Sequence, residues 1–314
     1  MTLLSRLDRW KDQGTLTPEQ HMLLAGLSRG VPFSVFLELN LLLYAGVLAF
    51  VGGLGWTVRS YSQQLGDVVV LTVLSGIFAA CLWYCFSRAR HYSHAETPSP
   101  NAALDYVLYL GSLTWCVELA YIENRVHLLS GQWDLYLLAT ACFFFALAYR
   151  FDNRFVLSLA LSTLAGWFGL TISHWPGHKG AEYRKYAILY SLVVGGSGAG
   201  LHRLGIKRHF LGTYLNVATN VLFCALLSGV FNRDESISWF LLLLVACGAS
   251  LAYGLPRKQF SFVAYAAIYG YAGVSSILIH DIADEHVILS YFAITGIAMI
   301  VMLTQIARRF GRNA

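Results

Sequence analysis

The sequence LNLLLYAGVLAFVGGLGWTV, residues 39–58, is almost wholly apolar and carries no charged side chain. A helix rises about 1.5 Å per residue, so about 20 residues cross the roughly 30 Å hydrocarbon core of a bilayer. The stretch is apolar on every side, whereas a strand of a membrane β-barrel alternates apolar and polar residues. Because lipid cannot satisfy backbone N–H and C=O groups, the stretch is predicted to form a transmembrane helix.

Similar runs fill most of the remaining chain, which predicts an all-α polytopic membrane protein. Hydrophobic residues make up 57% of the sequence and charged residues only 12%, against roughly 25% charged in a soluble domain. There are ten such runs, and the sixth is short and glycine-rich. The expected number of transmembrane helices is therefore about ten. The predicted spans are 39–58, 67–87, 103–122, 132–150, 154–174, 186–202, 209–231, 237–254, 260–279 and 286–307.

The Lys and Arg residues divide unequally between the two ends of these spans. One side, which includes both termini and alternate loops, carries 16 of them, and the other side carries 6. Cytoplasmic loops of membrane proteins are enriched in Lys and Arg, so both termini are predicted to be cytoplasmic. The formal net charge of +5 reflects this bias, and we do not interpret it as nucleic-acid binding.

The sequence before the first span is polar and predicts a short cytoplasmic helical hairpin over residues 1–35. Its first helix should end at Gly14, and Thr17-Pro18-Glu19-Gln20 has the residue order of a capping box that opens a second helix. Residues 36–310 form the predicted transmembrane bundle, and residues 311–314 a cytoplasmic tail. The residues that give the first helix one apolar face are Leu3, Leu7 and Trp10.

Three motifs of the N-terminal half occur together. They are Leu7-x-x-Trp10-x-x-x-Gly14-x-Leu16-Thr17-Pro18-Glu19-Gln20, the start Leu-Leu-Tyr-x-Gly of the first span, and the loop Val126-His127-Leu128-Leu129-Ser130-Gly131-Gln132-Trp133. In this combination residues 1–170 resemble the predicted bacterial membrane proteins of domain-of-unknown-function family 2157. The resemblance implies a multipass protein of the bacterial inner membrane and no established activity. Glu118 departs from the family pattern, which has a small or apolar residue there.

Glu118 lies about one turn inside the outer end of the third span. An ionised carboxylate in hydrocarbon costs about 2.5 kcal/mol or more, so this side chain should face the bundle, a watery cavity or a positive partner. One interpretation is a proton or cation site. The alternative is a hydrated carboxylate near the interface, or one paired with Arg125.

Polar residues in the seventh span lie at i, i+3 and i+7, which places them on one helix face. They are Thr213, Asn216 and Asn220. Amides in lipid need hydrogen-bond partners, and such residues often join helices at about 0.6 kcal/mol per bond. The stripe therefore either holds helices together or lines a substrate path.

Gly196 and Gly200 have the Gly-x-x-x-Gly spacing of a close helix–helix contact. The alternative for this glycine-rich sixth span is a broken helix that exposes carbonyl groups at a binding site. Three basic residues just before it keep that alternative open. They are Lys179, Arg184 and Lys185.

Histidines gather near the predicted outer face, where imidazole could serve as a metal ligand. The weak candidates are His127, His174, His178, His280 and His286. Pro176 and Gly177 break the helix that would align two of them, and the six cysteines lack Cys-x-x-Cys spacing, so no cofactor is expected.

The leading functional hypothesis is transport or permeation of a small solute or ion along a polar path formed by Glu118, Thr213, Asn216 and Asn220. The alternative is a non-catalytic membrane subunit or scaffold that docks a partner protein through residues 1–35. An enzyme acting on lipid ranks third, because no nucleophile and base stand out together. Lipid is the expected surrounding, and the oligomeric state is left open.

Overall fold

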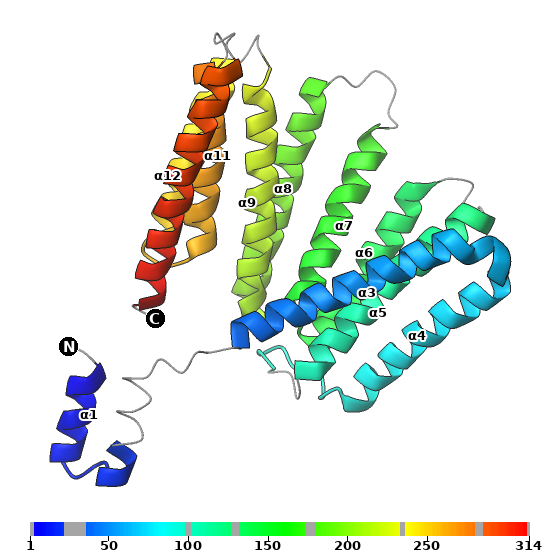
Figure 1. Cartoon of the computed structure of the whole chain (residues 1–314), viewed down its shortest axis with the longest axis horizontal. Helices are drawn as coiled ribbons and strands as arrows, with labels where there is room; N and C mark the ends of the chain where they lie inside the picture. Colours follow the sequence, from blue (N-terminus) through cyan, green and yellow to red (C-terminus); the bar gives the residue numbers. More distant parts are fainter. Residues whose placement is uncertain are drawn as a thin grey trace. The chain divides into compact units, whose positions relative to one another are not determined.

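A computed structural model of the chain describes residues 3–21, 36–97, 102–126, 132–173, 180–232, 236–279 and 285–312. Over these residues the structure consists of helices and their connections, with no strand (Figure 1). The chain divides into two compact units, residues 1–66 and residues 67–314, which we describe separately.

The first unit contains α1 (Leu3–Asp12) and α3 (Phe36–Leu65). α1 ends as predicted: Gly14 has a φ of 70°, and the backbone N–H groups of Gly14 and Thr15 donate to the carbonyls of Lys11 and Trp10 at 3.0 and 2.9 Å. This pair of bonds is a Schellman motif, and the left-handed conformation it needs favours glycine.

The capping box that opens the second predicted helix is confirmed. The backbone N–H of Gln20 donates to Oγ1 of Thr17 at 3.2 Å, and the backbone N–H of Thr17 donates to Oε1 of Gln20 at 3.1 Å. His21 then lies 2.9 Å from Asp8 of α1, which joins the two arms of the turn. The rest of the predicted hairpin lies outside the described residues, so its full extent stays a prediction.

The second unit is a set of long helices that run side by side in alternating directions (Figure 1). The most extensive packing joins neighbours in the chain, α4 with α5, α6 with α7, α8 with α9 and α10 with α11. The helices are α4 (Asp67–Arg88), α5 (Ala102–Val126), α6 (Trp133–Phe151), α7 (Arg154–Ser173), α8 (Gly180–Leu204), the 3-10 turn η1 (Arg208–Phe210), α9 (Leu211–Val230), α10 (Ser236–Gly254), α11 (Phe260–Ile279) and α12 (Glu285–Arg312).

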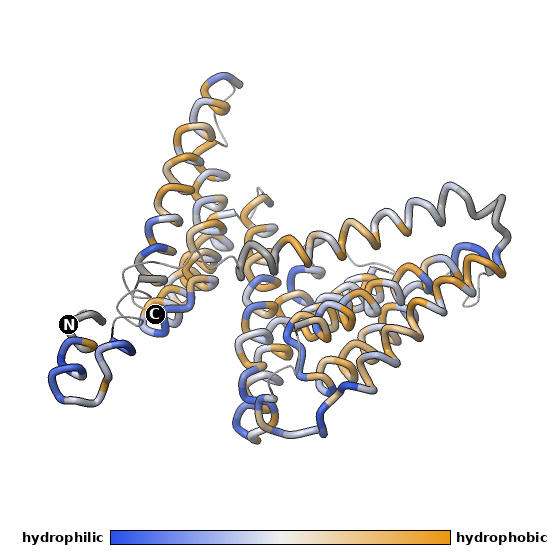
Figure 2. Tube along the Cα trace, turned by 60° about the horizontal axis from the view of Figure 1, so that its bottom comes forward, coloured by the Kyte–Doolittle hydropathy of each residue, from blue (hydrophilic) through white to orange (hydrophobic). Residues whose placement is uncertain are grey.

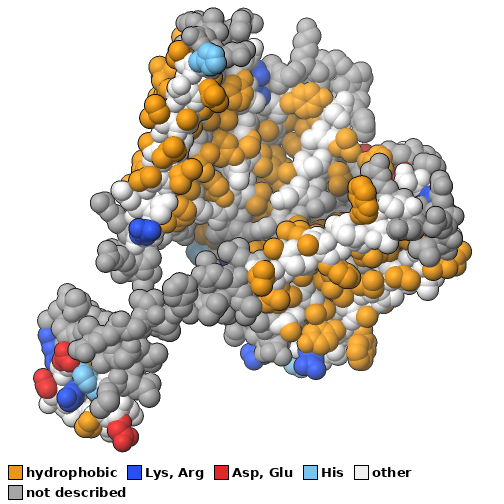
Figure 3. Space-filling model, in the orientation of Figure 1, with side chains coloured by type: hydrophobic (Ala, Val, Ile, Leu, Met, Phe, Trp, Pro, Cys, Tyr) orange, Lys and Arg blue, Asp and Glu red, His pale blue; other side chains and the backbone are white. Residues whose placement is uncertain are grey.

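Seven helices in the described part are long and apolar enough to cross a membrane. Figure 2 shows their hydrophobic middles and more polar ends, and Figure 3 shows apolar side chains over much of the visible face. A multipass protein surrounded by lipid accounts for this exposed apolar surface. The other three predicted spans coincide with α3, α5 and α8, which are not among these seven helices. The total of about ten therefore stays a prediction. The seven are Asp67–Arg88, Trp133–Phe151, Arg154–Ser173, Arg208–Val230, Ser236–Gly254, Phe260–Ile279 and His286–Arg308.

The contact between α8 and α9 depends on glycine, but not on the glycines we predicted. A Cβ added to Gly198 would lie 2.5 Å from Cβ of Tyr214, and one on Gly195 would lie 3.6 Å from Ala218. A Cβ on Gly196 or Gly200 would meet no atom of the described residues within 4 Å. The packing role predicted for Gly196 and Gly200 within this chain is therefore wrong, because about 100° of rotation per residue turns them away from α9.

The broken-helix alternative for the sixth span is also wrong. α8 runs without interruption from Gly180 to Leu204 through the whole glycine-rich segment. Glycine here lets two helices approach closely while the i to i−4 hydrogen bonds remain intact.

Candidate functional site

A cavity of about 720 Å³ lies among α7, α8 and α9. It has the size of a small-molecule site. Most of its wall is apolar, with a few polar side chains placed among alanines and valines. The lining residues are Ser162 and Ala165 of α7, Tyr183, Arg184 and Ala187 of α8, and Val217, Asn220, Val221, Cys224, Ala225 and Ser228 of α9.

The positions of these residues along their helices fix the depth of the cavity. Ser162 and Asn220 lie near the middle of α7 and α9, whereas Tyr183 and Ser228 lie near the ends of α8 and α9. α8 begins at the end of the unit where α7 and α9 finish. The cavity therefore extends from that end of the helices to about half their length.

Asn220 lies at the deep end of the cavity wall, as Ser162 does, and also contacts α11. Its Oδ1 accepts a hydrogen bond from the hydroxyl of Tyr269, whose ring stacks on Phe223 at 5.1 Å. Oη of Tyr269 also lies 3.1 Å from Sγ of Cys224. These contacts fix the amide orientation and leave Nδ2 without a hydrogen bond to any described residue.

Arg184 is the one charged side chain among the described lining residues, and it is only 9% exposed. Its guanidinium carbon lies 5.2 Å from the ring centre of Trp239 in α10. A Cβ on Gly229 of α9 would overlap the Trp239 side chain. The missing Cβ lets Trp239 pack against α9, where its ring face holds the guanidinium at the cavity wall.

The predicted polar stripe of the seventh span divides in the structure. Asn220 joins α9 to α11 through Tyr269 and also lines the cavity, so the choice between a helix contact and a substrate path stays open. Nδ2 of Asn216 instead donates to the carbonyl of Gly212 in its own helix at 2.8 Å. Neither Thr213 nor Asn216 lines the cavity. Both residues precede Val217, the lining residue closest to the start of α9, so they lie beyond the depth that the cavity reaches.

Glu118 lies elsewhere, between α4 and α5. It is 7% exposed, and its Oε1 accepts a hydrogen bond from the hydroxyl of Ser75. Oε2 has no hydrogen-bond partner among the described residues. Nε of Arg125 lies 3.4 Å from Asp67, which also accepts from the hydroxyl of Tyr121 at 2.6 Å. The predicted interior position of Glu118 is confirmed, but it does not share the cavity with Asn220.

The weak metal-site prediction finds no support in the described part of the chain. His127, His174, His178 and His280 lie outside the described residues. His286 is exposed on α12, and no group of three or more His, Cys, Asp or Glu side chains comes together among the residues that the structure describes.

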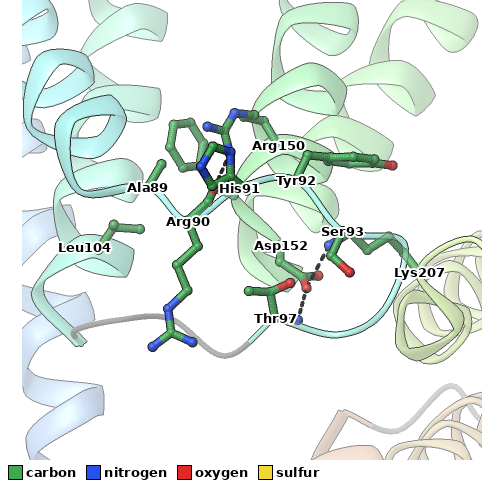
Figure 4. Close-up of a pocket in the computed structure, with 11 residues that line it drawn as sticks. Ala89, Arg90, His91, Tyr92, Ser93, Thr97, Leu104, Arg150, Asp152 and Lys207 are labelled. Atoms are coloured by element: carbon green, nitrogen blue, oxygen red, sulfur yellow. Dashed lines mark hydrogen bonds and ion pairs between the residues drawn. The ribbon is translucent and has the colours of Figure 1, made fainter.

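A second polar cluster lies at the opposite end of the helices, where the connections after α4, α6 and α8 meet (Figure 4). Oδ2 of Asp152 lies 2.9 Å from Nζ of Lys207 and accepts from the backbone N–H of Thr97 at 2.6 Å. Nε2 of His209 lies 2.5 Å from Oδ1 of Asp152. The side chains of Asp152 and Lys207 are 4% and 2% exposed. Sequence reasoning missed this cluster.

Contacts beside this cluster can be compared with the predicted order in which the spans cross the membrane. The guanidinium of Arg150 donates to the carbonyl of Arg90 at 2.9 Å, and that of Arg154 lies 2.7 Å from Glu96. The loops before α5, α7 and α9 therefore lie at one end, as the alternation of spans predicts. Which side of the membrane that end faces stays a prediction.

Comparison with known protein families, with curated proteins and with solved structures finds no match to this chain. The resemblance of residues 1–170 to domain-of-unknown-function family 2157 thus stays a prediction.

Proposed function

We propose that the protein is a multipass protein of the bacterial inner membrane, with both termini cytoplasmic, that moves a small solute across the bilayer. The observation that carries this proposal is the cavity among α7, α8 and α9, which reaches Asn220 at half the length of α9. Solute sites of transporters lie near the bilayer midplane, where unsatisfied polar groups are costly and must serve a purpose.

The proposed path includes Asn220 and leaves out Thr213, Asn216 and Glu118. The wall around Asn220 combines apolar side chains with a few polar groups, which is the usual composition of a small-molecule site. Glu118 fills no part of this wall, because it packs against Ser75 on the far side of α5 from α9. Its buried carboxyl remains a candidate proton or cation site, separate from the solute cavity.

Cys224 offers a native probe of the path, since it lines the cavity next to Asn220. We expect a small impermeant thiol reagent to modify Cys224 both in right-side-out and in inside-out membrane vesicles, because a transport site must become open to each side in turn. The measurement is the rate of modification by mass spectrometry, in protein whose other five cysteines are replaced by alanine.

Cys142 provides the matched control, because it lies within α6 and lines none of the described cavities. A variant that keeps only Cys142 should react far more slowly from either side. Modification of Cys224 from one side alone would indicate a binding pocket rather than a path. Equal rates at Cys142 and Cys224 would contradict the proposal altogether.

The scaffold function has one specific observation in its favour. Leu7 of α1 is 5% exposed, whereas Trp10, one turn later, is 48% exposed and offers apolar surface next to charged neighbours. Exposed aromatic side chains are enriched where proteins bind one another.

Deletion of residues 1–30 tests this second function. If the N-terminal turn serves only to dock a partner, the purified shortened protein should keep the thermal unfolding midpoint of the full chain. A midpoint lower by several degrees would show that the segment stabilises the protein itself, which contradicts a pure docking role.

A further inference from the structure

We infer that a pocket between the connection after α4 and the connection after α8 binds the headgroup of an anionic phospholipid. The pocket has a volume of about 680 Å³ and is separate from the solute cavity. The inference therefore holds whether or not that cavity moves a solute. The lining residues are His94, Ala95 and Glu96 from the first connection, and Gly205, Arg208 and His209 from the second.

Hydrogen bonds hold the two sides of the pocket together. The backbone N–H of Lys207 donates to the carbonyl of His94 at 2.9 Å, and its Nζ donates to the carbonyl of Ala95 at 3.2 Å. Gly205 has a φ of 80°, and a Cβ on it would lie 3.7 Å from Nη2 of Arg208. The Arg208 guanidinium therefore folds over this turn, next to the segment that carries His94.

The charge of the pocket favours an anion. Arg208 forms no ion pair with any residue that the structure describes. Glu96 is the one carboxylate among the described lining residues, and it already binds Arg154 at 2.7 Å. Asp152, in the cluster of Figure 4, binds Lys207 at 2.9 Å. The connections after α4, α6 and α8 carry seven Lys and Arg residues against three carboxylates, so cations remain in excess at this end of the helices.

The position of the pocket selects a lipid as the source of the anion. The segments Arg154–Ser173 and Arg208–Val230 are long and apolar enough to cross a membrane, so the pocket lies where they leave the hydrocarbon, at the level of the headgroups. Leu204, next to Gly205, is 74% exposed and offers apolar surface to an acyl chain. A guanidinium binds phosphate oxygens through charge-assisted hydrogen bonds, and the imidazole of His94 can donate another.

Dioleoylphosphatidylglycerol and dioleoylphosphatidylcholine form the test pair, because they share acyl chains and a phosphodiester but differ in net charge. Native mass spectrometry of the purified full chain in a neutral detergent gives the dissociation constant of each lipid. Phosphatidylglycerol should bind at least about fivefold more tightly, which is the effect of one cation near an anionic lipid surface. Arg208→Gln should remove most of this preference, and Arg208→Lys should keep part of it because the charge remains.

Arg257→Gln is the matched control. Arg257 is also an exposed arginine, stacked at 4.2 Å on Tyr253, but it lies in the connection between α10 and α11 and does not line the pocket. Its replacement should change the preference by less than about twofold, because a charge outside the pocket is screened from the headgroup.

Three outcomes would overturn the inference. Equal losses of preference in Arg208→Gln and Arg257→Gln would show a general attraction of the basic end for anionic lipid, without a site. Equal binding of the two lipids by the unaltered protein would overturn it without any variant, even if Arg208→Gln fails to fold. Displacement of phosphatidylglycerol by an equal concentration of inorganic phosphate would show that the pocket takes free phosphate and does not need a lipid.

Discussion

Asp152→Asn is expected to lower the free energy of unfolding by about 3–5 kcal/mol, because it leaves the buried ammonium of Lys207 without its counter-charge. The two side chains are 4% and 2% exposed and lie 2.9 Å apart, so water cannot replace the lost partner. Asp152 has a φ of 59°. Asn tolerates this left-handed conformation as well as Asp does, so the substitution removes the charge and leaves the backbone unstrained.

The measurement is chemical or thermal unfolding of the purified protein in a mild detergent. Glu96→Gln is the matched control, since Glu96 pairs with Arg154 at 2.7 Å but both side chains are more than half exposed. An exposed pair contributes at most about 1 kcal/mol. Equal, small effects of the two substitutions would show that Asp152 and Lys207 are hydrated and that the cluster does not hold the three connections together.

The sequence alone predicted the features that depend on composition and on short spacings. The apolar run after residue 36 required helices in lipid, and helices lie at each predicted span. Gly14 and the residues from Thr17 to Gln20 predicted a helix end and a capping box, and both are confirmed because each motif needs only its own neighbours.

Features that join distant segments could not be predicted in this way. Asp152 and Lys207 are 55 residues apart, and each looks like an ordinary polar residue in a loop. Asn220 was recognised as a polar residue in lipid, but its partner Tyr269 lies 49 residues later and could have been any of many tyrosines. Arg184 appeared as one of several charges ahead of a span, because nothing local shows that α8 begins early enough to bury it.

The glycine-rich α8 shows why a motif can be recognised and still be assigned to the wrong face. Gly196 and Gly200 have the familiar spacing, but Gly195 and Gly198 are also about one turn apart, and only the position of α9 decides between the two pairs. Leu192 and Val193, on the side of Gly196 and Gly200, are 64% and 58% exposed. Side chains that face lipid carry no sequence signal that separates them from side chains that face a neighbouring helix.

Gly198→Ala and Gly196→Ala should therefore change stability in opposite directions. A methyl group on Gly198 would lie 2.5 Å from Cβ and 2.9 Å from Cγ of Tyr214. Tyr214 cannot easily withdraw, because its hydroxyl lies 2.9 Å from that of Tyr149 and its side chain is 6% exposed. Overpacking of this kind costs about 1–3 kcal/mol. The same methyl group on Gly196 meets no atom within 4 Å in the part of the chain that the structure describes.

Gly196→Ala should raise the free energy of unfolding by about 0.5–1 kcal/mol, since alanine loses less backbone entropy than glycine when a helix forms. Unfolding midpoints of the two variants, measured side by side in the same detergent, give the sign directly. Two equal losses would mean that α8 also packs through its Gly196 face against something beyond its own chain, in which case the Gly-x-x-x-Gly spacing would mark an oligomer contact. Two equal gains would mean that α8 and α9 separate easily, and the wall of the solute cavity that they share would then be mobile.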